Sequence, residues 1–169
     1  MIRDLTEKEI ECKVSTISEK GCSLLLYKTA RTDMAILDEI YGPMNWQCEY
    51  EEVKGNMYCT ISVYDPDKKE WVSKQDCGVE SAFGDKEKGE ASDAFKRAGF
   101  KWGIGVELYT SPFIWIPADK CKITTKKDKF ITYDKFIVEK IKIENKEITG
   151  LAIINTTTKE RVFVFKKGE

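Results

Sequence analysis

The stretch that decides the fold is Lys88-Gly89-Glu90-Ala91-Ser92-Asp93-Ala94-Phe95-Lys96-Arg97-Ala98-Gly99-Phe100-Lys101-Trp102-Gly103-Ile104-Gly105. At the roughly 100° per residue of an α-helix, one side of it collects small and aromatic residues, namely Ala91, Ala94, Phe95, Ala98 and Trp102. Small residues let a helix approach a sheet closely, so this side predicts a buried face. The glycines at 103 and 105 predict the end of the helix.

The opposite side of the same helix is charged. It carries Asp93, Lys96, Arg97 and Phe100, with Lys101 at its flank. Proteins that bind single-stranded nucleic acid combine two features: cations that contact the phosphates, and an aromatic ring on which a base stacks. The alternative is a solvated amphipathic helix in which Asp93 pairs with Arg97 one turn away.

Three alternating runs precede this helix, at residues 46–51, 57–64 and 71–77, with turns at 54–56 and 65–69. Each run has one apolar and one polar face, which predicts a sheet covered on one side. We therefore expect an α+β fold, in which an antiparallel three-stranded β-meander is packed by one long helix. Runs at 136–143, 147–155 and 160–165 predict a small C-terminal β-meander. The expected domains are residues 1–119, an α+β DNA-binding core, and residues 120–169, a basic β-rich extension.

The composition argues against most catalytic chemistry. The 169 residues include no histidine, which excludes Ser-His-Asp and Cys-His catalysis and imidazole metal ligation. The six cysteines are spread singly without a C-x-x-C pair, which disfavours a structural zinc site. We expect a binding protein with no catalytic residue, no metal and no cofactor.

Charge is distributed unevenly along the chain. Residues 1–119 carry 15 Lys and Arg against 22 Asp and Glu, whereas residues 120–169 carry 13 against 7. A polyanion site in the first part must therefore be a local concentration of cations. No apolar run approaches the roughly 20 residues of a membrane span and the first residues do not resemble a signal peptide, so we expect a cytoplasmic protein without a membrane partner.

The order of several motifs resembles a known family. Tyr27-x-x-Ala30-Arg31 is followed by Leu37-Asp38-Glu39-Ile40-Tyr41-Gly42-x-x-Asn45-Trp46-Gln47, three strands, Cys77-Gly78-Val79 and Ser92-Asp93-Ala94-Phe95-Lys96-Arg97-Ala98. This succession, over roughly residues 5–118, is similar to the Rad-fifty-two superfamily of single-strand annealing proteins, in particular its short phage and prophage Sak-like branch. Residues 120–169 carry no motif that belongs to the resemblance.

The resemblance implies a homo-oligomeric ring that holds single-stranded DNA in an outer groove and anneals complementary strands without ATP, in recombination and repair. The groove-lining Lys-Arg pair of the family falls on Lys96 and Arg97, and a basic residue after the first helix falls on Lys13. Where some relatives carry a further arginine, this chain has Phe100 and then Lys101, so either Lys101 or stacking by Phe100 replaces it. Implied protein partners are a phage exonuclease or a host single-strand binding protein.

Three alternatives remain open at this point. A protein of the same fold could protect DNA ends without annealing them. A metal-dependent nuclease could be assembled from Pro66-Asp67 and Glu144-x-Lys146, although Pro66-Asp67-Lys68-Lys69 is a better turn than metal site. A purely structural role would use the acidic first part and the basic second part to contact each other or neighbouring subunits.

Overall fold

The computed structural model describes residues 2–79 and 86–168, with the side chains of the last helix described from residue 89 onward. Among these residues the chain is mostly β, with eleven strands, two α-helices and two short 3-10 helices. The expected α+β fold class is therefore wrong. The C-terminal runs do not form a separate meander, because they complete a sheet that the N-terminal hairpin begins.

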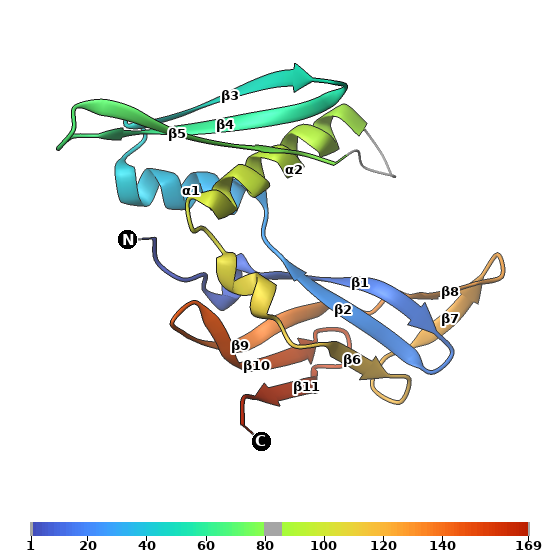
Figure 1. The fold of residues 1–169 in the computed structure, drawn as a ribbon. Helices are drawn as coiled ribbons and strands as arrows, with labels where there is room; N and C mark the ends of the chain where they lie inside the picture. Colours follow the sequence, from blue (N-terminus) through green and yellow to red (C-terminus); the bar gives the residue numbers. More distant parts are fainter. Residues whose placement is uncertain (1, 80–85, 169) are drawn as a thin grey trace. The chain divides into compact units, whose positions relative to one another are not determined.

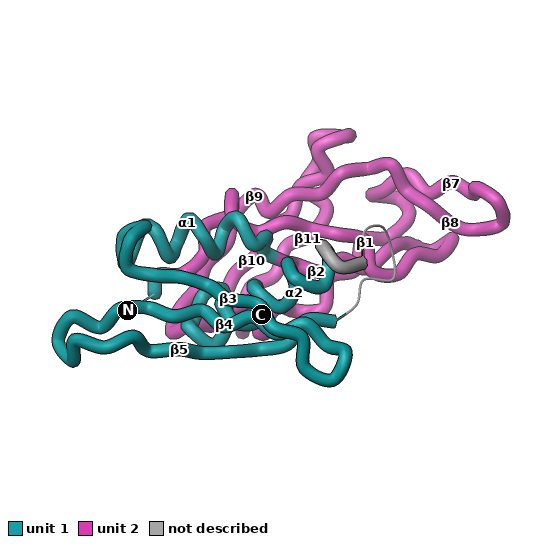
Figure 2. Tube along the Cα trace, turned by 90° about the horizontal axis from the view of Figure 1, so that it is seen from above, with its two compact units in different colours: residues 1–3, 28–105 teal, residues 4–27, 106–169 magenta. Residues whose placement is uncertain are grey.

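The chain divides into two compact units (Figure 2). Unit 1 comprises residues 1–3 and 28–105, and unit 2 comprises residues 4–27 and 106–169. The expected domain boundary between residues 119 and 120 falls inside unit 2. Unit 1 is inserted between two strands of unit 2 that pair with each other.

Unit 1 is a three-stranded antiparallel sheet with two helices on one of its faces (Figure 1). Its elements are α1 (Ala30–Tyr41), β3 (Trp46–Val53), β4 (Asn56–Asp65), β5 (Glu70–Cys77) and α2 (Lys86–Lys101). The central strand β4 alternates, and its Cys59, Ile61 and Val63 are 0–4% exposed. The helices therefore cover the apolar face that the alternation predicts.

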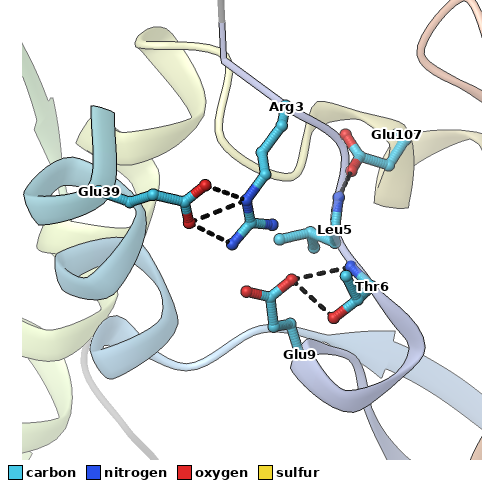
Figure 3. Close-up of polar contacts among 6 residues, drawn as sticks. All are labelled: Arg3, Leu5, Thr6, Glu9, Glu39 and Glu107. Carbon is cyan, nitrogen blue, oxygen red and sulfur yellow. Dashed lines mark hydrogen bonds and ion pairs between the residues drawn. The ribbon is translucent and has the colours of Figure 1, made fainter. Parts of the chain in front are cut away.

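Local sequence sets the ends of α1. The Thr29 side chain accepts a hydrogen bond from the Thr32 amide, which caps the first turn. Gly42 follows the helix at φ 82°, a conformation that favours glycine, and its amide donates to the Asp38 carbonyl. Arg3 binds the Glu39 carboxylate of α1 in a fork, with Nε–Oε1 at 2.9 Å and Nη2–Oε2 at 2.8 Å (Figure 3).

Unit 2 is built on a six-stranded sheet in the order β11-β10-β9-β1-β2-β6. Its strands are β1 (Glu11–Ser18), β2 (Gly21–Tyr27), β6 (Ile114–Pro117), β9 (Phe136–Glu144), β10 (Glu147–Asn155) and β11 (Glu160–Lys166). The hairpin of β7 (Ile123–Lys126) and β8 (Lys129–Thr132) forms a separate two-stranded sheet. The register of β1 with β9 consists of the pair Glu11 and Ile137, so the two halves of the large sheet meet at a narrow junction.

Two short 3-10 helices, η1 (Glu7–Glu9) and η2 (Val106–Thr110), complete unit 2. The Glu9 carboxylate accepts from the Thr6 amide at 2.8 Å, the contact that a capping box makes at the start of a helix. The fully buried Glu107 of η2 accepts from the Leu5 amide at 2.7 Å (Figure 3). Glu107 thereby anchors the start of unit 2 to the segment that follows unit 1 in the chain.

Candidate nucleic-acid interface

The helix α2 packs on β4 and β5 through the face that its sequence predicts. Ala94, Phe95 and Ala98 are 0% exposed, which confirms these three core positions. The Phe95 ring lies 6.1 Å from that of Trp46 on β3. After Lys101 the chain turns at Gly103, with φ 92°, and the Ile104 amide donates to the Gly99 carbonyl. This packing fixes which way the charged side chains of α2 point.

Arg97 and Lys101 both point toward the edge strand β5. Each lies 3.7 Å from an oxygen of Asp76, with Arg97 Nε on Oδ1 and Lys101 Nζ on Oδ2. Their side chains are 42% and 50% exposed, although the Nε atom of Arg97 is buried and has no hydrogen-bond partner among the described residues, and one carboxylate lies between the two cations. An exposed ion pair of this kind contributes about 0–1 kcal/mol, which leaves both cations able to exchange partners.

A third cation, Lys74 of β5, extends this cluster. Its ammonium lies 4.5 Å from the centre of the Trp102 ring and donates to the Lys101 carbonyl at 2.8 Å. We name Lys74, Asp76, Arg97 and Lys101 the α2/β5 seam. The seam carries three cations and one carboxylate, so it is positive although residues 1–119 as a whole are acidic.

Lys96 is separate from the seam. Its ammonium lies 3.7 Å from Oδ1 of Asp93, whose other oxygen accepts from the Val79 amide at 3.1 Å. Both residues line a surface hollow of about 380 Å³ with Gly89 and Ser92. Lys96 and Arg97 therefore have different carboxylate partners, Asp93 for Lys96 and Asp76 for Arg97.

Phe100 is half-buried, and its ring is contacted from within unit 1. Its ring centre lies 4.1 Å from the ammonium of Lys28, which is 2% exposed. One face of the ring is thus engaged by a cation of the same unit. Whether a base stacks on Phe100 stays a prediction.

Lys28 belongs to a buried ion pair that the sequence did not reveal. Its ammonium binds Asp33 Oδ2 and donates to the Lys96 carbonyl at 3.1 Å, and both side chains are at most 1% exposed. Burial raises the pKa of Asp33 to about 6, against the opposing attraction of Lys28. Because Lys28 holds the backbone of α2 at Lys96, this pair positions the helix that carries Arg97 and Lys101.

Lys13, the remaining predicted contact, lies on β1 in unit 2 and is exposed. Its backbone pairs in register with Leu25 of β2. It therefore belongs to a different unit from Lys96, Arg97, Phe100 and Lys101, and its part in DNA binding stays a prediction.

The seam residues Lys74 and Asp76 were missed by sequence reasoning, which treated β5 as a scaffold. The signal was present in the strand alternation. Lys74 pairs in register with Ile61 and Asp76 with Cys59, both buried toward the helices, so both polar residues are directed to the α2 side. A charged residue on the helix-facing side of an edge strand indicates that the helices no longer bury the sheet at that position.

The described residues contain no group of three or more Cys, Asp or Glu side chains arranged to hold a metal ion. Asp67, half of the considered nuclease pattern, lies in a turn where its amide donates to Asp65 Oδ1 at 3.0 Å. No described helix is long and apolar enough to cross a membrane. Comparison with protein-family models, curated proteins and solved structures finds no match to this chain.

Proposed function

We propose that the protein binds single-stranded DNA through the α2/β5 seam and anneals complementary strands without ATP, as a homo-oligomer. The observation that carries this proposal is that Arg97 and Lys101 share the carboxylate of Asp76, while Lys74 lies beside them and donates to the Lys101 carbonyl. Phosphate contacts from such cations give affinity for any sequence. An annealing protein needs this property because it must accept every strand.

The chemistry of the seam also suits the exposure of bases. Its cations are half-exposed side chains at the surface, so a strand held there by its phosphates keeps its bases free to pair. The carboxylate of Asp76 opposes phosphate binding because it neutralises part of the positive charge of Arg97 and Lys101. A bound phosphate replaces Asp76 as the partner of Arg97 and Lys101, at a small cost because exposed ion pairs are weak.

The sharpest test changes the carboxylate. Asp76→Asn removes one negative charge from the seam, so affinity for a labelled oligonucleotide should rise at low salt. Asp67→Asn makes the same change of net charge in the turn between β4 and β5, and should leave affinity as in the wild type. Equal effects of the two variants would show that net charge, and not the seam, governs binding.

Loss of cations should act in the opposite direction. Arg97→Ala and Lys101→Ala should each weaken binding and reduce the slope of log K against log salt by about 0.7 for a single strand. Lys96→Ala tests whether the hollow that Lys96 lines also contacts DNA. Unchanged binding in both Arg97→Ala and Lys101→Ala would remove the seam as the site.

Annealing and assembly need their own measurements. Two complementary labelled oligonucleotides, mixed without ATP, should anneal faster with the wild type than with Arg97→Ala. Binding without faster annealing would instead indicate an end-protecting protein. Light scattering after size exclusion should give a homo-oligomer, the proposed ring. A phage exonuclease or host single-strand binding protein is the proposed protein partner, to be tested by co-purification.

A further inference from the structure

The outer face of strands β9, β10 and β11 in unit 2 is basic at its edges and flat at its centre. In the register of the sheet, Gly150 of β10 lies between Lys142 of β9 and Lys166 of β11. One step along, Ala152 lies between Lys140 and Val164. Residues paired in this way project from the same face of a sheet, so Gly150 lies between two lysines and Ala152 between a lysine and a valine.

The opposite face of these strands is the core of unit 2, which fixes this orientation. Ile148, Leu151 and Ile153 of β10 are 0–3% exposed, whereas Lys140, Lys142 and Lys166 are exposed. A shallow hollow of about 360 Å³ is lined by Lys142, Glu144, Gly150, Val164, Lys166 and Lys167, among others. A side chain at Gly150 would begin to fill this hollow, since an added Cβ lies 3.3 Å from Cβ of Lys142.

Cations exceed carboxylates on this surface. It carries Lys140, Lys142, Arg161, Lys166 and Lys167. Three carboxylates accompany them, each paired with a cation, Glu139 with Arg161, Glu144 with Lys142 and Glu147 with Lys167. These are exposed pairs of low strength, which a stronger anionic ligand can replace. We name Lys140, Lys142, Gly150, Ala152 and Lys166 the β9–β11 strip.

We infer that the β9–β11 strip binds the phosphate backbone of a single nucleic-acid strand, as a second site on the chain. Lys140 and Lys142 lie two residues apart on one strand, hence about 7 Å. Cations repeated at such an interval suit a ligand whose phosphates also repeat at short, regular intervals. Gly150 has no side chain and Ala152 is 8% exposed, so a backbone can lie low between Lys142 and Lys166 without an anchoring pocket for a base. The strip lysines are part of the excess of Lys and Arg over Asp and Glu in residues 120–169.

The inference does not depend on the α2/β5 seam. It concerns a different unit, and its evidence is the register, exposure and charge of three strands of unit 2. A chain with both sites would hold two strands, or two parts of one strand, at once.

The test uses the full chain with Lys140→Ala, Lys142→Ala and Lys166→Ala combined. Binding of a labelled mixed-sequence oligonucleotide is measured over a salt series. Three lost phosphate contacts should lower the slope of log K against log salt by about 2, at 0.7 for each contact with a single strand. A matched triple variant, Lys54→Ala, Lys68→Ala and Lys69→Ala, makes the same change of net charge on exposed turns of unit 1 and should keep the wild-type slope.

The outcomes separate the strip from the seam. An unchanged slope in the strip variant, with a lowered slope in Arg97→Ala, overturns the strip and leaves the seam. A lowered slope in the strip variant alone supports the strip and counts against the seam. Equal losses in the strip variant and the matched triple variant overturn the strip, since net charge then explains both. Binding of the wild type to phosphatidylserine vesicles but not to the oligonucleotide also overturns it. Unaltered circular dichroism of each variant is required as a folding control.

Discussion

Replacement of Gly99 by alanine should destabilise the protein, contrary to the usual effect in a helix. Gly99 lies in the last turn of α2, where alanine is ordinarily more stable by up to about 1 kcal/mol. Here an added Cβ would lie 2.4 Å from Asp33 Oδ2 and 3.5 Å from Lys28 Nζ. The glycine is therefore required by the buried ion pair that passes under the helix.

The magnitude follows from the surroundings of that pair. Overpacking a well-filled core costs about 1–3 kcal/mol. Asp33 is 0% exposed, and its other oxygen, Oδ1, lacks a hydrogen-bond partner in the described part of the chain. If the new Cβ displaces the carboxylate from Lys28, no other hydrogen-bond donor of that part is in place to receive it. Displacement from Lys28 would add part of the 3–5 kcal/mol typical of a broken buried pair. After the gain in helix propensity, the net loss should be about 2–4 kcal/mol.

The assay is urea unfolding, followed by circular dichroism and by tryptophan fluorescence. Gly89→Ala, in the first half of the same helix, is the matched control, and should be neutral or stabilising by up to about 1 kcal/mol. The decisive comparison uses the background Lys28→Met with Asp33→Ala, which removes the atoms that the new Cβ would meet. There Gly99→Ala should stabilise. The reasoning is refuted if Gly99→Ala destabilises both backgrounds equally, within the roughly 0.5 kcal/mol expected of independent sites.

Three further changes test other parts of the structure. Because burial raises the folded-state pKa of Asp33 to about 6, the folded state holds this proton more tightly than the unfolded state. The stability that this proton adds should be fully present below about pH 4 and be lost as the pH rises through 6. Urea titrations of Asp33→Asn should lack this pH dependence. Ala98→Leu inserts bulk at a fully buried contact between α2 and the sheet, and should lower the free energy of unfolding by about 1–3 kcal/mol while leaving Arg97 in place. Glu107→Ala removes the acceptor of the Leu5 amide and should cost about 1–3 kcal/mol, whereas Glu107→Gln retains an acceptor oxygen and should cost less; equal losses would contradict this role.

The sequence predicted local elements of this fold better than their assembly. Alternation located the strands around β4, and small residues located the buried side of α2 at Ala94 and Ala98. It did not show that the last three strands share a sheet with β1, since strand partners distant in sequence are chosen by packing and not by periodicity. The fold class was therefore wrong although most of its elements were located.

The candidate site shows the same limit. A helix projection correctly separates Lys96 and Arg97 from the core, but it places both on one patch. Their directions depend on the carboxylates that neighbouring elements supply, Asp93 for one and Asp76 for the other. The contact between Phe100 and Lys28 was missed for a similar reason, because Lys28 lies 72 positions earlier in the chain.

The insertion of unit 1 within unit 2 also sets an order of events during synthesis. The hairpin of β1 and β2 leaves the ribosome long before β6 and β9, the strands that flank it in the sheet. A lone hairpin is marginally stable and its open edges can pair with other chains. Residues 28 to 105, the main part of unit 1, can fold in the meantime and so shorten the loop that β2 and β6 must close. The nascent chain is thus most vulnerable to aggregation until its C-terminal strands emerge, and truncations that remove β9 to β11 should leave an N-terminal hairpin that recruits foreign strands.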